Sequence, residues 1–288
     1  QILVIFLIKK LLWQNFSGKE YPVVLEYFAN VHPVDISFGW REDRLLFDEA
    51  VEIARKSDVA IVNIGFNESS ERESNDRPFE LPEYQDSLVQ CITAANPNTV
   101  VLLNAGGNVD MSKWIDKVPS LLHLWYAGQE GGTAVAEILF GKVNPSGKLP
   151  ISFEKKWEDN PTYNSYYDPD HDFHVPYTEG IFVGYRGYDK FNREVQYPFG
   201  FGLSYTTFKL SDMRVFQDPV DDRKAKITCK LTNTGKKGGS EVVQLYIGKP
   251  SNNGVEQPLK ELKSFKKVYL EPGQSAEVEM DLTKDSFS

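Results

Sequence analysis

The 288-residue sequence contains few cysteines, no excess of positive charge and no long hydrophobic segment. The 32 basic and 41 acidic residues give a net charge of −9, which argues against nucleic acid as a partner because no basic patch stands out. No apolar run reaches transmembrane length, so we expect no membrane-spanning segment. Residues 1–8 are apolar, but they lack the preceding basic region and the following small-residue cleavage site of a signal peptide.

The two cysteines, Cys91 and Cys229, lie far apart in the sequence and neither require nor exclude an oxidising compartment. Cys91 falls in a helical pattern with Leu88 and Ile92, so we expect it to be a buried free thiol. Hydrophobic residues at 41% and charged residues at 25% indicate a soluble globular protein, long enough for two domains. Aromatic residues at 13% are only weak support for sugar binding, because aromatic side chains also build cores.

Residues 41–153 alternate strand and helix patterns, which is typical of an α/β fold with a mostly parallel sheet and helices on both faces. Leu46, Ala50, Ile53 and Ala54 recur at helical spacing and predict a helix that ends near Lys56. Further along the chain we expect strands at 59–64, 99–103 and 121–125, and helices at 82–95, 112–116 and 130–140. In open α/β sheets ligands bind where the strands end, which here means the loops at 63–76, 104–110 and 126–131.

The segments on either side of this α/β region have different patterns. Residues 1–40 carry partly alternating strands at 21–27 and 34–40, and we interpret them as the end of another domain. Residues 154–203 form a connecting segment rich in Tyr, Pro and Gly, and a connection of this length is usually functional or wraps another domain. Residues 204–288 predict an immunoglobulin-like sandwich with strands at 225–232, 241–247, 262–270 and 276–282.

The predicted sandwich is incomplete. Four or five strands are visible where such a domain needs about seven, and the chain stops at Ser288. The start at Gln1 rather than Met indicates a processed or excised piece. An unfinished sandwich exposes a sheet edge, which favours self-association into a homo-oligomer.

The main candidate site is the charged segment at residues 71–77, which follows a buried strand and precedes a predicted helix. It holds two carboxylates one residue apart, Glu71 and Glu73, followed by Asp76 and Arg77. A glutamate becomes a useful general acid only when burial or a neighbouring carboxylate raises its pKa, and this loop offers such a neighbour. From these residues alone, a solvated surface loop is the simpler interpretation.

Two other motifs indicate neither a metal nor a cofactor. His171 and His174 lack an evident third or fourth ligand, so we expect two loop histidines and no metal site. Residues 104–107, Asn-Ala-Gly-Gly, lack the full glycine pattern of a nucleotide loop, and we expect no cofactor there.

Two groups of aromatic and polar residues have alternative interpretations. The first group lies at the end of a predicted strand and is as consistent with core or domain packing as with binding: Trp125, Tyr126 and Gln129. We expect the second group to pack between domains, with an aromatic sugar subsite as the secondary interpretation: Tyr185, Arg186, Tyr188 and Phe191.

Several long motifs, in matching order and with similar spacing, resemble the C-terminal half of glycoside hydrolase family 3, which contains β-glucosidases and β-xylosidases. They span about residues 45–283 and include NIGFNESSERESNDRPFELP, LWYAGQEGGTAVAEILFG and FVGYRGYDKFNREVQYPFGFGLSYTTF. The resemblance implies an α/β sandwich domain followed by a fibronectin type III-like domain. Residues 18–40 are similar to the end of a lectin-like β-sandwich that some members insert before this point.

The resemblance implies retaining hydrolysis of O-glycosyl bonds at the non-reducing end of an oligosaccharide or glycoside, without a cofactor. An Asp nucleophile forms a glycosyl-enzyme, and a Glu acts first as general acid and then as base. In this family the nucleophile belongs to an N-terminal TIM barrel, and neither its Ser-Asp-Trp type motif nor an eight-fold βα pattern occurs here. We therefore expect a barrel partner, in the same protein or as a separate chain, and no activity from this chain alone.

Members with an E-x-E-G-x-D-R pattern carry the acid/base in the loop that this charged segment matches. Glu73, three residues before Asp76, is our first choice for that role, and Glu71 is the second. Ser74 stands where many members have Gly, which permits backbone conformations that Ser does not. We expect Asp76 and Arg77 to hold the loop rather than to touch the sugar.

Two other functions stay open at this point. A non-catalytic carbohydrate-binding or scaffold fragment is favoured if no partner supplies the barrel, and a nucleotide-binding α/β protein has little support. For the full protein we expect a periplasmic or secreted location. The sugar and linkage are left open, because in this family the barrel supplies most contacts to the sugar.

Overall fold

The computed structural model describes residues 9–14, 20–25, 47–74, 76–168, 172–221, 224–248, 254 and 256–287. The chain divides into two units, residues 1–48 and residues 49–288. In the first unit, β1 (Lys9–Gln14) and β2 (Glu20–Leu25) pair as an antiparallel hairpin. The strand predicted at 21–27 corresponds to β2, and the strand predicted at 34–40 lies outside the described residues.

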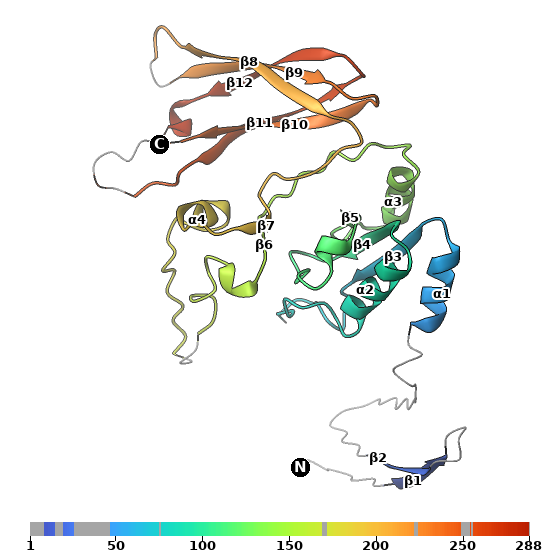
Figure 1. Ribbon diagram of the computed structural model, residues 1–288. Coiled ribbons are helices and arrows are strands. Elements are labelled where there is room, and N and C mark those ends of the chain that lie inside the picture. The colour runs from blue at the N-terminus through green and yellow to red at the C-terminus, as the bar shows by residue number, and fades with distance from the viewer. Residues whose placement is uncertain are drawn as a thin grey trace. The chain divides into compact units, whose positions relative to one another are not determined.

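The α/β region is built on three parallel strands in the order β3-β4-β5 (Figure 1). Alternate residues of β3 face the core and are buried, and α1 and α2 contribute to the same core. The predicted α/β class with a parallel sheet is confirmed. The bounds of these elements are α1 (Asp48–Lys56), β3 (Ala60–Gly65), α2 (Gln85–Ala95), β4 (Thr99–Asn104) and β5 (Ser120–His123).

A single hydrophobic core fixes the strands of this sheet relative to the helices. Val89 of α2 and Val101 and Leu103 of β4 are fully buried, and Trp114 in the loop after β4 is 1% exposed. Burying a side chain of this size contributes about 1.5–3 kcal/mol. The carboxyl ends of β3, β4 and β5 are therefore rigid supports for the loops that follow them.

Helix α2 corrects one sequence prediction. It begins at Gln85, three residues after the predicted start, and Tyr84 just before it has a left-handed φ of 71°. Its core-facing side chains are Val89 and Ile92, whereas Cys91 is exposed, so the prediction of a buried thiol at Cys91 is wrong. Successive helical residues point about 100° apart, which turns Cys91 away from the core even though Ile92 lies next to it.

The remaining helices of the region are short. α3 (Gly131–Leu139) matches the predicted helix, and Gly141 follows it with a φ of 69°, the left-handed conformation typical of a glycine at a helix end. The helix predicted at 112–116 is instead a turn followed by a 3₁₀-helix, η2 (Ile115–Lys117). No helix within the described residues is long and apolar enough to cross a membrane.

The two ends of the connecting segment are joined by a pair of short antiparallel strands. β6 (Phe153–Glu154) pairs with β7 (Val195–Tyr197), and between them lie η3 (Trp157–Asp159) and α4 (Tyr185–Lys190). This pairing brings the two ends of the segment together beside the α/β core, where Phe153 is 1% exposed. The domain boundaries at 41, 154 and 204 stay predictions.

The C-terminal region is built on β-strands, as predicted, with two sheets in the orders β12-β9-β8 and β10-β11, followed by a short 3₁₀-helix, η4 (Lys284–Ser286). Its core includes the fully buried Leu231 and Val278 and the nearly fully buried Leu270. β8 has no counterpart among the predicted strands, because most of its residues are exposed and the pattern of alternation is lost. The five strands are β8 (Phe208–Gln217), β9 (Ala225–Asn233), β10 (Gly239–Ile247), β11 (Glu261–Leu270) and β12 (Ser275–Leu282).

Polar contacts join the sandwich to the preceding segments. The Asn144 side chain donates to the Gly238 carbonyl at 2.9 Å and accepts from the Tyr205 backbone N–H at 2.8 Å. Lys148 forms a half-buried ion pair with Glu241 at 2.7 Å.

Part of the predicted packing between domains is also present. The Tyr185 hydroxyl accepts from the Leu262 backbone N–H at 2.9 Å, and an Arg186 nitrogen lies 3.6 Å from Glu261. These contacts confirm a packing role for Tyr185 and Arg186. Phe191 is 48% exposed.

Candidate active site

The charged loop leaves the carboxyl end of β3 in a turn organised by Asn67. The Asn67 carbonyl accepts from the backbone N–H groups of Ser70 and Glu71 at 2.9 and 2.8 Å. The side-chain oxygen of Asn67 accepts from the Ser69 backbone N–H at 3.0 Å, an arrangement that short polar side chains form readily in turns. The turn carries Glu71 to the ends of the neighbouring strands.

Glu71 is engaged by two groups of the protein itself. Nε of Arg77 lies 3.4 Å from one carboxylate oxygen, and the Tyr126 phenol, just after β5, donates to the same oxygen. Burial, followed by the hydrogen bond and the charge of Glu71, raises the pKa of Tyr126 to about 12, so the phenol stays a donor at neutral pH. The carboxylate of Glu71 is thus part of a fixed network.

Arg77 connects this network to the loop after β4. One of its terminal nitrogens donates to the Asn108 carbonyl at 2.6 Å, and the other donates to the Pro78 carbonyl at 3.2 Å. Its guanidinium carbon lies 4.9 Å from the centre of the Phe66 ring. Arg77 holds the loop, and its ion-pair partner is Glu71 rather than Asp76, which accepts instead from the Tyr166 hydroxyl at 3.3 Å.

Two glycines after β4 make room for these side chains. A Cβ atom at Gly106 would lie 2.7 Å from a Glu71 carboxylate oxygen, and one at Gly107 would lie 3.0 Å from an Arg77 nitrogen. Both distances are shorter than ordinary van der Waals contact. The absence of side chains at Gly106 and Gly107 therefore lets Glu71 and Arg77 lie close to the backbone after β4.

Ser74 adopts the backbone conformation that glycine favours. Its φ of 61° lies in the left-handed region, which costs a residue with a Cβ atom about 1–2 kcal/mol. The loop therefore carries backbone strain directly after Glu73.

Glu73 differs from Glu71 in having no engaged partner. Its side chain is exposed, and it forms neither a hydrogen bond nor an ion pair with another described residue. The two glutamates of the E-x-E pair therefore differ in their environments: Glu71 is held by Arg77 and Tyr126, and Glu73 is exposed with no side-chain partner among the described residues.

Behind the loop lies a histidine that sequence reasoning did not single out. His123, the last residue of β5, has no hydrogen-bond partner among the described residues at either ring nitrogen. Its ring packs edge-on against Trp125 and Phe153, with centroid distances of 4.4 and 5.2 Å. Burial and then the positive charge of Arg77 lower the pKa of His123 to about 4.

Within the described ranges, no group of three His, Cys, Asp or Glu side chains is arranged to hold a metal ion. His174 is exposed, with Nδ1 3.3 Å from an Asp172 carboxylate oxygen, and His171 lies outside the described residues.

Sequence reasoning placed Tyr126, Gly106 and Gly107 in loops at strand ends but did not predict their contacts with Glu71 and Arg77. From the sequence, packing and binding were equally consistent roles for Tyr126. The only signal that linked this residue to the site was its position at the end of a predicted strand. Trp125 does pack against the core, and Gln129 is exposed.

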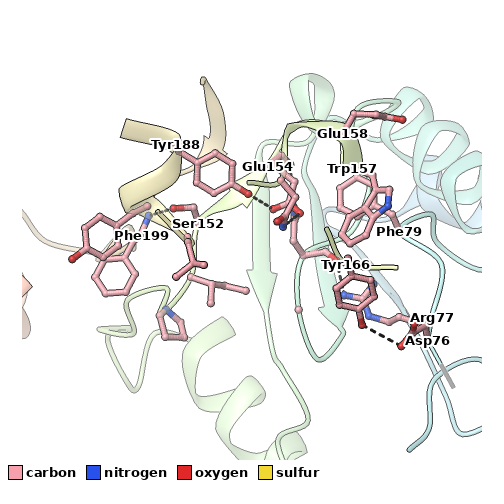
Figure 2. Close-up of a pocket in the computed structure, with 18 of the residues that line it drawn as sticks. Asp76, Arg77, Phe79, Ser152, Glu154, Trp157, Glu158, Tyr166, Tyr188 and Phe199 are labelled. Carbon is pink, nitrogen blue, oxygen red and sulfur yellow. Dashed lines mark hydrogen bonds between the residues drawn. The ribbon is translucent and has the colours of Figure 1, made fainter. Parts of the chain in front are cut away.

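A cavity of about 830 Å³ adjoins the loop on the side of the connecting segment (Figure 2). Asp76 and Arg77 line it from the loop, and Glu154, Trp157 and Tyr188 line it from the connecting segment.

A parallel α/β sheet with a carboxylate loop at its strand ends, followed by a β-sandwich, is the domain arrangement that the sequence motifs implied. The Glycosyl hydrolase family 3 C-terminal domain matches residues 25–205, and the Fibronectin type III-like domain matches residues 241–288. The chain belongs to glycoside hydrolase family 3, which confirms the resemblance.

Individual relatives agree with this assignment. The chain is 44% identical over 248 residues to the thermostable beta-glucosidase B of Acetivibrio thermocellus, covering 85% of this chain and 32% of that protein. It is 38% identical over 247 residues to an exo-alpha-(1->6)-L-arabinopyranosidase of Bifidobacterium breve, with coverages of 85% and 32%. The crystal structure of a Bifidobacterium adolescentis GH3 beta-glucosidase superposes with a TM-score of 0.80 at 40% identity, covering 86% of this chain and 36% of that one. The chain thus spans about a third of the length of these relatives.

Proposed function

We propose that this chain is the acid/base-bearing part of a retaining, exo-acting β-glycosidase, with β-glucosides as the substrate class. The observation that carries the proposal is the contrast between the two loop glutamates: Glu71 is engaged by Arg77 and Tyr126, whereas Glu73 is exposed and has no partner in the part of the chain that the structure describes. The names of the relatives favour glucosides. The arabinopyranosidase of Bifidobacterium breve identifies pentopyranosides as the substrates to test beside them.

In the proposed mechanism Glu73 is the general acid/base. It protonates the glycosidic oxygen as an Asp nucleophile attacks the anomeric carbon, and the aglycone leaves with that proton. Glu73 then removes a proton from water as the water displaces the nucleophile and releases the sugar. The two carboxyl groups lie about 5–5.5 Å apart in enzymes of this kind, so the nucleophile must face this loop from a TIM barrel outside the chain.

Glu71 has a supporting role in this scheme. A residue that alternates between acid and base must exchange its proton with substrate and water in each cycle. The oxygen of Glu71 that faces Arg77 also accepts from Tyr126, so it is already occupied by the protein. Glu73 has no such contact within the described residues, and its exposed position on the loop permits contact with a sugar bound on a facing domain.

The test is the kinetics of the complete protein with Glu73→Gln. General acid–base catalysis contributes about 10²–10⁴-fold, so turnover of an aryl β-glucoside with a poor leaving group should fall by that factor. With a dinitrophenyl leaving group the first step needs no acid, and the glycosyl-enzyme should accumulate. Azide should then restore turnover and give β-glucosyl azide as product, since an anion attacks without base assistance.

Matched variants separate the glutamates of the loop. Glu71→Gln should lower turnover without azide rescue, because it disturbs the loop and leaves the acid/base in place. Glu68 is an exposed glutamate three residues before Glu71, so Glu68→Gln is the matched control and should leave the kinetics unchanged. Azide rescue of the Glu71 variant and not of the Glu73 variant would exchange the two roles.

The alternative, a non-catalytic carbohydrate-binding or scaffold fragment, makes a different prediction. Sugar binding without hydrolysis, even when the full-length protein with its barrel is assayed, would support it. The periplasmic or secreted location is part of the same proposal and is tested by fractionating cells that express the full protein.

A further inference from the structure

The cavity beside the loop contains a buried carboxylate that has no cationic partner. Glu154 is 6% exposed and lies at the end of β6. One carboxylate oxygen accepts from the Tyr188 hydroxyl at 3.2 Å (Figure 2). The other accepts from the Asn160 side-chain nitrogen at 3.1 Å. No ion pair to Glu154 occurs within the described part of the chain.

Neutral donors leave acceptor capacity on this carboxylate. An ionised carboxylate offers about four acceptor positions, and the described residues fill two of them. Burial, then the charge of Glu154, raises the pKa of Tyr188, which keeps its hydroxyl a donor to Glu154. Since a buried charge without full hydrogen bonding is costly, further donors from a ligand would stabilise this arrangement.

Aromatic rings form much of the cavity wall. Trp157 is in edge contact with Tyr166, with 6.2 Å between ring centres, and Tyr166 is in edge contact with Tyr167 at 4.9 Å. Tyr166 and Tyr167 are 48% and 55% exposed, so part of this aromatic surface remains open to solvent. Phe79 and Phe199 also line the cavity. The volume of about 830 Å³ falls within the range of about 300–1,000 Å³ that is typical of ligand pockets.

The groups around the cavity include both hydrogen-bond acceptors and donors, which suits a ligand that can donate and accept. Two guanidinium groups, those of Arg77 and Arg186, line the cavity together with four carboxylates, those of Asp76, Glu80, Glu154 and Glu158. A cation would gain from the carboxylates and rings but would meet both guanidinium groups. A polyhydroxylated ligand can donate to the carboxylates, accept from the guanidinium groups and lay its apolar face on a ring.

We propose that this cavity binds a sugar unit, separate from the bond-cleaving position at Glu73, with Glu154 accepting from ring hydroxyls and Tyr167 providing a stacking face. The choice of ligand rests on the proposed glycosidase function. The cavity would hold a glucoside product or a distal unit of an oligosaccharide.

The test is sugar binding by the 288-residue chain itself, without hydrolysis. Cellobiose and methyl β-glucoside are titrated by calorimetry and by saturation-transfer NMR, with tetramethylammonium as the cationic probe. We expect both sugars to bind and tetramethylammonium to give no transfer. Glu154→Gln should lower sugar affinity about tenfold, the scale of one hydrogen bond to a charged group. Tyr167→Ala should also lower sugar affinity, because it removes the ring on which the apolar face of the sugar lies.

Tyr177→Ala is the matched control, because Tyr177 is 82% exposed in the same segment and does not line the cavity. Its affinity should equal that of the unchanged protein. Tyr167 has a largely exposed ring, so its replacement is informative even if the Glu154 variant fails to fold.

Three results would overturn the proposal: no transfer from either sugar at about 50 mM, well above a millimolar Kd; sugar binding that neither cavity variant alters; or preferential binding of tetramethylammonium. Failure of the proposed function is seen separately. It appears as full turnover by Glu73→Gln in the complete protein, whatever the isolated chain binds.

Discussion

His123 predicts a specific loss of stability in mild acid. In the folded protein its ring packs against Trp125 and Phe153, neither ring nitrogen has a described partner, and its pKa is lowered to about 4. In the unfolded chain the pKa returns to about 6.5. Because the folded-state value is the lower one, the stabilisation is complete above pH 6.5. It is lost as the pH falls from 6.5 toward 4, because in this range the histidine is protonated in the unfolded chain but neutral in the folded protein.

The size of this effect follows from the shift. Each pKa unit corresponds to about 1.4 kcal/mol, and between pH 7.5 and pH 4.5 the linkage gives about 2.5 kcal/mol. The ring is only partly buried, so solvent screening reduces this figure to about 2 kcal/mol. His123→Leu removes the titrating group and keeps an apolar side chain of similar volume. The free energy of unfolding of the variant should therefore fall less between the two pH values, by about 2 kcal/mol.

The assay is urea unfolding of the chain and of His123→Leu at both pH values. Carboxylates that titrate in the same range contribute to both proteins and cancel in the comparison. The sequence contains four histidines, so NMR can also follow the ring of His123 directly. An identical pH dependence in the two proteins, or an NMR titration of His123 near pH 6.5, would refute the reasoning.

Two further predictions concern the loop. Ser74→Gly should stabilise the chain by about 0.5–1 kcal/mol, because glycine adopts the φ of 61° without the steric cost that a Cβ atom brings. The midpoints of urea unfolding measure this change in stability. A variant less stable than the unchanged chain would contradict the prediction. Tyr126→Phe and Glu71→Gln should show a coupling energy of about 1 kcal/mol in a double-mutant cycle, below the range for buried charged hydrogen bonds because Tyr126 is 56% exposed. Additive effects would mean that the phenol does not hold the carboxylate.

The secondary structure of the α/β region was largely predictable, because it follows from local periodicity. The buried runs of β3 and β4 and the spacing in α1 and α3 are visible in short windows of sequence. The errors occur where packing overrides the pattern. Cys91 has the spacing of a core residue but lies on the side of α2 that faces away from Val89 and Ile92. β8 is largely exposed and shows no clear alternation.

The sequence by itself determined the position of the carboxylate loop and narrowed the candidates for the proposed acid/base to two glutamates, because loop, strand and motif are local features. Only the tertiary structure distinguished the environments of Glu71 and Glu73. One of the two partners that engage Glu71 is Tyr126, 55 residues further along the chain, and the space for the Glu71 carboxylate comes from Gly106. The order β3-β4-β5 brings these residues together at one edge of the sheet, and no local pattern encodes such a contact.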